Sequence, residues 1–213
     1  MVPVSAARTT NPSTSVTNAE AIASASIQLG NSSRTSASCS TSREKATISV
    51  RLSRKTWRRP GNSSATIQDK YLTQPPDFSG FNAPDKGKAT AAGMFDAGAD
   101  VVYAAAGGSG AGVFVAAKAA SAWAIGVDSD QYLSADAAVQ SVILTSALKN
   151  VNVAVFDVIS ASVKGSPLSG VQVYDLKNNG VGYSKSNPAV QPFEAKADAA
   201  AQAIISGSVV VPN

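Results

Sequence analysis

The sequence predicts an α/β fold with a mostly parallel β-sheet flanked by helices. Two observations carry this prediction, and both concern residues 70–213. Short apolar runs alternate there with segments of helical composition, and Gly-rich or polar turns separate them. Such alternation is typical of βαβ units with right-handed crossovers. About 140 residues can bury roughly two-thirds of their unfolded surface, so this part is long enough to form a core.

Each element follows from local signals. Residues 85–98 have a helical composition, with Pro84 suited to the first turn and Gly98 suited to end the helix. The turn "GGSGAG" at 107–112 follows the first apolar run. The predicted strands are 99–106, 123–128, 141–148, 170–176, 180–184 and 208–212. The other predicted helices are 113–122, 150–165 and 193–206.

Residues 1–70 have a different composition. They are rich in Ser and Thr, and all seven Arg of the chain lie before residue 60. The net charge is +6 for residues 1–69 and −2 for the rest. A segment with so few large apolar side chains buries too little surface on folding to offset the loss of chain entropy, and we therefore expect disorder or weak structure. A short helix at 19–29 and a strand at 46–53 are the candidate elements within it. A frame error upstream of a genuine domain would also produce this switch in composition.

The composition excludes several kinds of chemistry. The sequence contains no His, which excludes Ser-His-Asp triads and histidine metal sites. It contains a single Cys, Cys39, which excludes an internal disulfide. We therefore expect no catalysis, no cofactor and no metal. No apolar run approaches the length of about 20 residues that a membrane helix needs. The N-terminus lacks the apolar segment of a secretory signal, and Ser36 occupies the place where a lipoprotein cleavage site needs a branched apolar residue.

The basic cluster "RLSRKTWRR" at 51–59 has two interpretations. It could be a nucleic-acid patch in which Trp57 stacks on a base. Short basic runs are weak motifs, so a solvated charge run is the interpretation we favour, and we expect no nucleic-acid partner.

Candidate site residues follow two neighbouring predicted strands. Open parallel sheets bind ligands at the carboxyl ends of their strands, where 107–112 and 128–131 fall. "GGSGAG" fits neither the Rossmann, the Walker nor the nucleophile-elbow spacing. The backbone N–H groups of Gly107 and Gly108 can donate to a hydroxyl or an anion, or the motif is simply a tight turn.

Three side chains extend this site. Asp128 can accept hydrogen bonds from neighbouring sugar hydroxyls, or it caps a turn, and Asp130 is expected to be the more solvated carboxylate. Lys149 ends a strand and either reaches a ligand oxygen or marks a solvated strand end. Phe81, in a loop, either stacks on a planar base or is a satellite core contact.

Residues 71–213 resemble one family. The stretch from "DFSGFNAPDKG" through "GVDSDQ", followed by "VILTSALKNVNVAVFD" and "LKNNGVGYS", is similar to the basic membrane protein (BMP) family of ABC transporter substrate-binding lipoproteins, which includes a bacterial purine nucleoside receptor. The resemblance implies a lobe like those of periplasmic binding proteins, which close on a ligand by hinge motion. Phe81 would stack on the base, Gly107 and Gly108 would donate from the backbone, and Asp128 would hold the ribose diol with assistance from Lys149.

The resemblance also implies partners and a location. We expect a purine nucleoside or related solute, an ABC permease in the membrane, a monomer, and a place in the cell envelope, in the periplasm or on the outer face of the cytoplasmic membrane. "FNAPDKG" departs from the family pattern because Ala83 stands where Asp is usual. Residues 1–70 do not resemble the family's opening lobe, so we expect a truncated or frame-disrupted receptor that binds poorly.

Two other classes compete with this one. An α/β cofactor- or sugar-binding enzyme is the first, although the missing His and the failed nucleotide motifs count against it. A nucleic-acid-binding protein that acts through 51–59 is the second.

Overall fold

The computed structural model describes residues 3–8 and 66–211, with side chains from residue 68 onward. The strands are β1 (Pro3–Arg8), β2 (Thr66–Tyr71), β3 (Val101–Tyr103), β4 (Trp123–Asp128), β5 (Ile143–Lys149) and β6 (Val181–Tyr183). The helices are α2 (Pro84–Asp96), α3 (Gly110–Ala120), α4 (Gln131–Ser134), α5 (Ala137–Gln140), α6 (Val151–Val163) and α7 (Gln191–Ile205). Three 3-10 helices are η1 (Ser79–Asn82), η2 (Gly107–Ser109) and η3 (Pro188–Val190).

The six strands form one sheet in the order β2-β1-β3-β4-β5-β6. The central strands β3, β4 and β5 are parallel, while β1, β2 and β6 join through antiparallel pairings. The predicted α/β class with a mostly parallel core is therefore confirmed. Because β3, β4 and β5 are parallel neighbours, their carboxyl ends meet at one edge of the sheet.

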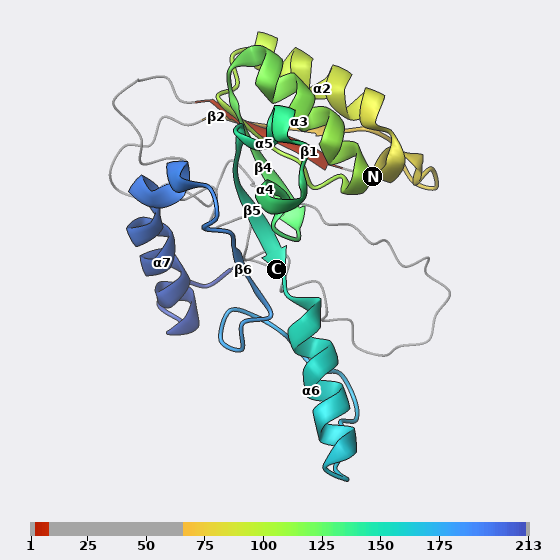
Figure 1. Cartoon of the computed structure of the whole chain (residues 1–213), viewed down its shortest axis with the longest axis vertical. Coiled ribbons are helices and arrows are strands. Elements are labelled where there is room, and N and C mark those ends of the chain that lie inside the picture. Colours follow the sequence, from red (N-terminus) through yellow and green to blue (C-terminus); the bar gives the residue numbers. More distant parts are fainter. Residues whose placement is uncertain (1–2, 9–65, 212–213) are drawn as a thin grey trace.

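Two buried clusters hold the helices to the sheet, one on each face. Met94 of α2 and Phe114 of α3 pack with Val102 and Ile143 of the sheet in the first cluster. Val190 and Phe193, from η3 and α7, pack on the strands in the second cluster. Figure 1 accordingly shows α2 and α3 on one side of the sheet and α7 on the other.

The helices α2 and α3 approach each other closely because glycine occupies both sides of their contact. A Cβ on Gly112 would lie 1.8 Å from the carbonyl oxygen of Pro84, and a Cβ on Gly87 would lie 2.3 Å from the carbonyl oxygen of Ser109. No side chain fits at either position without moving the backbone. This approach brings the start of α2, and the η1 turn before it, against the start of α3.

The helix α6 differs from the other long helices because none of its 13 residues is buried; the four-residue helices α4 and α5 share this property. It begins two residues after β5 and extends away from the sheet (Figure 1). The segment that follows returns along it: the N–H of Asn150 donates to the carbonyl oxygen of Gly180 at 2.8 Å, and its side-chain amide donates to that of Asn179 at 2.8 Å.

Several elements agree with the predictions and some do not. The helices predicted at 85–98, 150–165 and 193–206 and the strands predicted at 123–128 and 141–148 are confirmed with small shifts of boundary. The strand predicted at 99–106 is shorter, and the helix predicted from 113 begins earlier, at Gly110.

Two predicted strands are wrong. Residues 170–176 are irregular and pass into a turn, in which the N–H of Asp175 donates to Oδ1 of Asn178 at 2.7 Å. Val171 and Val173 alternate as in a strand, but both are exposed and pair with no neighbouring strand of the described sheet. Residues 208–211 are also irregular, and the N–H of Val209 donates to the carbonyl oxygen of Ala203 at the end of α7.

Parts of the first seventy residues contribute to the sheet. The strands β1 and β2 pair in an antiparallel register from Pro3 opposite Tyr71 to Arg8 opposite Thr66, and neither is evident from the sequence. The predictions for 19–29, 46–53 and 51–59 lie outside the described residues, as does Cys39. Over the described ranges no helix combines the length and the apolar character needed to cross a membrane.

Candidate ligand-binding site

The turn after β3 brings Gly107 and Gly108 against the loop that carries Phe81. Gly107 has a positive φ of 54°, and a Cβ there would lie 2.9 Å from the carbonyl oxygen of Phe81. A Cβ on Gly108 would lie 3.2 Å from Oδ1 of Asn82. Glycine is therefore required at Gly107 both for its conformation and for this close approach. Both glycines lie at the start of a helical segment, where backbone N–H groups have no acceptor within the helix.

Ser109, which the sequence analysis did not select, connects the turn at Gly107 to the loop that carries Phe81 through hydrogen bonds. Its side chain is fully buried. The hydroxyl donates to the carbonyl oxygen of Gly80 at 2.6 Å and accepts from the N–H of Ala83 at 2.7 Å. These bonds fix both ends of the turn that carries Phe81. The Phe81 ring is half-buried and packs against the first core cluster, so part of it serves as a core contact.

Asp128 and Lys149 form an ion pair at the ends of β4 and β5. The Nζ of Lys149 lies 2.9 Å from Oδ1 of Asp128, and the side chains are 46% and 52% exposed respectively. The strand register explains the contact, because Asp128 lies opposite Leu148. Asp128 also has a positive φ of 68°, so the chain turns sharply there. An exposed pair of this kind contributes at most about 1 kcal/mol to stability. Because both side chains are about half exposed, both charges remain accessible to a ligand.

Tyr103 is a further candidate that sequence reasoning missed. It is the last residue of β3, and its hydroxyl is buried without a hydrogen-bond partner among the described residues. Burial raises the pKa of Tyr103, and the negative charge of Asp128 raises it further. The hydroxyl is therefore a neutral donor near Asp128. A buried polar group without a partner is rare in native proteins and is consistent with a group that binds a ligand.

Asp130 is less solvated than predicted. Its Oδ1 atom is buried without a partner among the described residues, and its Oδ2 atom accepts a hydrogen bond from the hydroxyl of Ser186. The segment around Ser186 is held against β5, because Thr145 donates to the carbonyl oxygen of Ser184 at 2.6 Å and Asn187 donates to that of Ile143 at 2.9 Å. The prediction that Asp130 is the more solvated of the two carboxylates is wrong, because Asp128 is exposed and Asp130 is half-buried.

Four of the five residues selected from the sequence thus lie at or after consecutive strand ends, and Phe81 lies in η1 before α2. Gly107 and Gly108 follow β3, Asp128 ends β4, and Lys149 ends β5. Phe81 contacts the Gly107 turn, and Asp128 contacts Lys149. No direct contact joins these two groups among the described residues, so they can form one site only by facing the same ligand. Their joint role remains a prediction.

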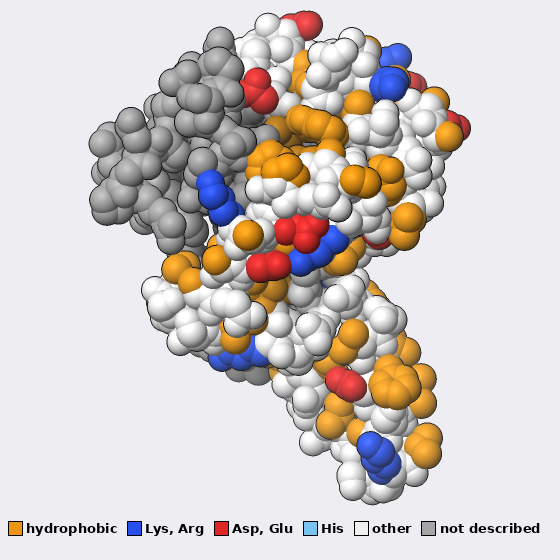
Figure 2. Space-filling view, turned by 60° about the vertical axis from the view of Figure 1, so that its left-hand side comes forward, with side chains coloured by type: hydrophobic (Ala, Val, Ile, Leu, Met, Phe, Trp, Pro, Cys, Tyr) orange, Lys and Arg blue, Asp and Glu red, His pale blue; other side chains and the backbone are white. Residues whose placement is uncertain are grey.

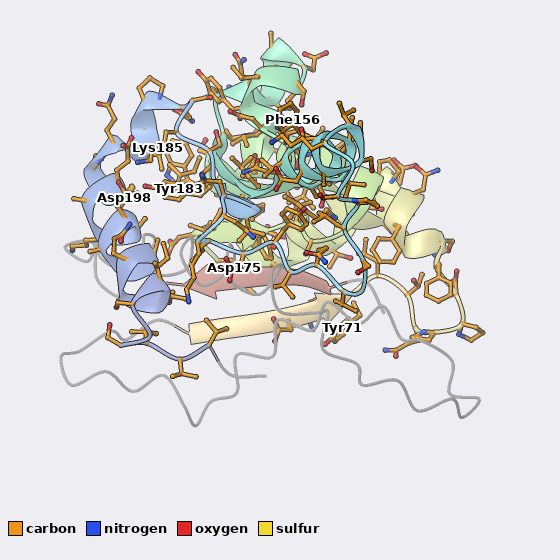
Figure 3. All side chains as sticks on the ribbon, turned by 90° about the horizontal axis from the view of Figure 1, so that it is seen from below. Tyr71, Phe156, Asp175, Tyr183, Lys185 and Asp198 are labelled. Carbon is orange, nitrogen blue, oxygen red and sulfur yellow. The ribbon has the colours of Figure 1, made fainter. Side chains whose placement is uncertain are left out.

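A separate polar cluster lies where β6 meets α7. The hydroxyl of Tyr183 donates to Oδ1 of Asp198 at 2.7 Å, and Nζ of Lys185 donates to its Oδ2 at 2.8 Å. Figure 3 shows Tyr183, Lys185 and Asp198 side by side at α7. Burial, and then the hydrogen bond to Asp198, raise the pKa of Tyr183 to about 12. The three side chains provide hydrogen-bond partners for one another, which is typical of a structural cluster.

Within the described ranges no group of three or more Cys, Asp and Glu side chains could hold a metal ion. A cavity of about 490 Å³ lies elsewhere, between α6 and the segment that returns along it. Its lining includes Asp157, Lys164, Gln172 and Tyr174, and none of the five candidate residues.

Comparison with known proteins identifies the class that this fold and site define. The family of PnrA-like ABC transporter substrate-binding proteins (Bmp) matches residues 75–213. The chain belongs to this family, whose role is to bind rather than to catalyse. The resemblance predicted from the sequence is therefore confirmed.

Individual relatives agree with this assignment. The chain is 37% identical over 147 residues to the "ABC transporter nucleoside-binding protein BmpA" of Lactococcus lactis subsp. cremoris, covering 62% of this chain and 42% of that protein. It is 34% identical over 166 residues to the "CD4+ T-cell-stimulating antigen" of Listeria monocytogenes, covering 71% of this chain and 45% of that one. The matched region thus spans less than half the length of these relatives.

A solved structure shows the same fold. The solute-binding protein of an ABC transporter system from Conexibacter woesei superposes with a TM-score of 0.54 at 24% identity. The match covers 62% of this chain and 44% of that protein.

Proposed function

We propose that this protein is the substrate-binding component of an ABC transporter and that it binds a purine nucleoside or a chemically related solute. The observation that carries the proposal is the set of donors and acceptors at the carboxyl ends of β3, β4 and β5 in a chain of this family. The printed name of the Lactococcus lactis relative, a nucleoside-binding protein, supports the choice of solute class.

The chemistry of a nucleoside suits the groups available. Its base is planar and apolar on both faces, and the half-buried ring of Phe81 offers a surface on which it can stack. Its ribose carries two neighbouring hydroxyls, and the two oxygens of the Asp128 carboxylate can accept a hydrogen bond from each. The N–H groups of Gly107 and Gly108 and the hydroxyl of Tyr103 supply donors for the remaining oxygens. Lys149 keeps the Asp128 carboxylate neutralised in the free protein.

The described residues form only one wall around such a ligand. The side chains of Asp128 and Lys149 are about half exposed, whereas small-molecule sites typically bury 70–90% of a ligand. We therefore expect weak binding by this chain.

A transporter component of this class delivers its solute to a membrane permease. We include such a permease, and a location outside the cytoplasm, in the proposal because the family implies both.

Titration calorimetry of the full chain with adenosine, guanosine and inosine tests the proposed function. We expect saturable binding of at least one nucleoside and no comparable binding of ribose or of the free base alone. The Asp128→Asn variant should bind at least about tenfold more weakly, because hydrogen bonds to a charged acceptor are worth roughly 1.5–3 kcal/mol. The Asp96→Asn variant is the matched control, because Asp96 is an exposed carboxylate at the far end of α2.

If none of the three nucleosides shows saturable binding, the proposal is contradicted. Unchanged affinity in the Asp128→Asn variant would contradict the assignment of that residue to the ribose.

A further inference from the structure

The backbone N–H group of Val127, near the end of β4, lies where the sheet provides no acceptor for it. The carbonyl oxygen of Ile125 accepts from the N–H of Ala104 at 2.9 Å, so Ile125 faces β3. Val127 follows two residues later and faces the same side, because the direction alternates along a strand. However, β3 ends at Tyr103, whose partner is Ile125, and Val127 lies beyond this last pair. A buried donor in this position needs another acceptor.

The side chain of Gln131 supplies this acceptor. Its Oε1 atom accepts from the N–H of Val127 at 2.8 Å, and its backbone N–H donates to Oγ of Ser146 on β5 at 3.1 Å. The residue is thus bonded to β4 and β5 at the same time. Its amide lies over Gly126, since a Cβ there would overlap Oε1 of Gln131 and would lie 2.8 Å from Oγ of Ser146. Glycine at position 126 therefore leaves the space that the amide occupies.

The bond between Val127 and Gln131 closes the turn that contains Asp128. Within this turn Asp128 adopts a positive φ of 68°. That conformation is unfavourable for a residue with a Cβ, and it persists only where the surrounding contacts hold it. Gln131 supplies one such contact. A second is the hydrogen bond that Ser186 donates to Oδ2 of Asp130.

The conformation of Asp128 determines where its carboxylate lies. In the closed turn Oδ1 lies 2.9 Å from Nζ of Lys149. Lys149 is separated by a single residue from α6, which projects from the body of the molecule (Figure 2). The bond to Gln131 therefore acts on the Asp128 side of the ion pair, which belongs to the body of the molecule.

We propose that Gln131 is a positioning residue of the candidate site: through Val127 it holds Asp128 in the conformation that presents the carboxylate to a solute. The role in binding rests on the proposed function, in which the solute contacts Asp128. A turn released from Gln131 would adopt other conformations, and apparent affinity falls in proportion to the fraction of molecules that can bind. The sequence analysis did not select Gln131, because only the folded chain brings its amide to Val127.

Amide hydrogen exchange of the full chain, followed by NMR, tests the contact without any ligand. The Gln131→Met variant keeps the length of the side chain and removes the amide acceptor. We expect the Val127 N–H to exchange at least about fivefold faster in this variant than in the parent. The Gln131→Glu variant retains an oxygen acceptor and should restore the protection. The Gln202→Met variant is the matched control, because Gln202 is exposed on α7.

Titration calorimetry with adenosine, guanosine and inosine tests the role in binding. The Gln131→Met variant should bind at least about fivefold more weakly than the parent, because Asp128 leaves its unfavourable conformation. The Val190→Ala variant separates this effect from a general loss of stability. Val190 is fully buried in the second core cluster, so its truncation should lower the free energy of unfolding and leave nucleoside affinity unchanged.

The Gly126→Ala variant tests the same contact from the other side. The new methyl group should displace the Gln131 amide and should reproduce both the faster exchange of Val127 and the loss of affinity. Because the two changes break one contact, the Gly126→Ala/Gln131→Met double variant should bind no more weakly than either single variant. Losses that add in the double variant would overturn the proposed role of Gln131.

Unchanged exchange of Val127 in the Gln131→Met variant would also overturn it, as would unchanged nucleoside affinity in a variant whose Val127 exchange has increased. Failure of the parent chain to bind any of the three nucleosides would instead overturn the proposed function and, with it, the role of Gln131 in binding. The exchange experiment would still decide whether Gln131 holds the turn.

Discussion

The hydroxyl of Ser109 donates a hydrogen bond of 2.6 Å to the carbonyl oxygen of Gly80, across 29 residues of sequence. It also accepts from the N–H of Ala83 at 2.7 Å. One buried hydroxyl therefore positions the whole turn that presents Phe81 next to Gly107. Because Ser109 is itself part of η2, the aromatic ring and the glycine N–H groups are held in a fixed relation.

The Ser109→Ala variant should lose both bonds and leave two backbone groups without partners. We expect the free energy of unfolding to fall by about 2 kcal/mol, since unsatisfied buried groups cost roughly 1–3 kcal/mol each. Nucleoside affinity should fall as well, because the Phe81 turn is released. Chemical denaturation and calorimetry measure the two effects. The Ser134→Ala variant, at an exposed helix end, should change neither.

Two glycine substitutions should have effects of opposite sign. The Gly107→Ala variant combines a positive φ with a close contact to Phe81, so we expect a loss of about 1–2 kcal/mol in the free energy of unfolding. Gly93 lies inside α2, where a Cβ would meet no atom within 4 Å. The Gly93→Ala variant should therefore gain about 0.5–1 kcal/mol. Equal effects in the two variants would contradict this interpretation of Gly107.

The Tyr103→Phe variant separates a structural role from a binding role. The Tyr103 hydroxyl has no partner among the described residues, so its removal should leave the free protein as stable as before or up to about 1 kcal/mol more stable. Nucleoside affinity should nevertheless fall, because a donor near Asp128 is lost. Destabilisation without a loss of affinity would show that the hydroxyl serves the fold alone.

The cluster at α7 should titrate at high pH. Burial and the hydrogen bond to Asp198 raise the pKa of Tyr183 to about 12, so its contribution to stability is complete below pH ~10 and is lost as the pH rises through about 12. The ultraviolet difference titration between the parent protein and the Tyr183→Phe variant reports this group. In an Asp198→Asn background the same titration should move to lower pH, because the carboxylate no longer opposes ionisation.

The sequence predicts the central part of the fold well because local signals and global topology agree there. Pro84 and Gly98 bound α2, and the apolar runs of β4 and β5 have helices on either side. The segment 170–176 shows the limit of such reasoning. Its alternating valines have the period of a strand, yet a strand also needs a neighbouring edge with which to pair, and local sequence does not reveal whether one is available.

The candidate site was predictable only in part. Gly107 and Asp128 follow buried strands, which is a local signal of a strand end. Tyr103 has the pattern of an ordinary core residue, and its missing partner is visible only in three dimensions. Ser109 acts through Gly80 and Ala83, which are far from it in sequence. Asp130 is covered by Ser186, 56 residues away.

The short connection between β5 and α6 has a thermodynamic consequence. Lys149, the partner of Asp128, is separated by a single residue from the start of α6. A change in the direction of α6 would alter the angle at which Lys149 approaches Asp128. Solute affinity would then be linked to the binding of anything that changes the direction of α6, and any factor by which one binding event alters the other must apply equally in the reverse direction.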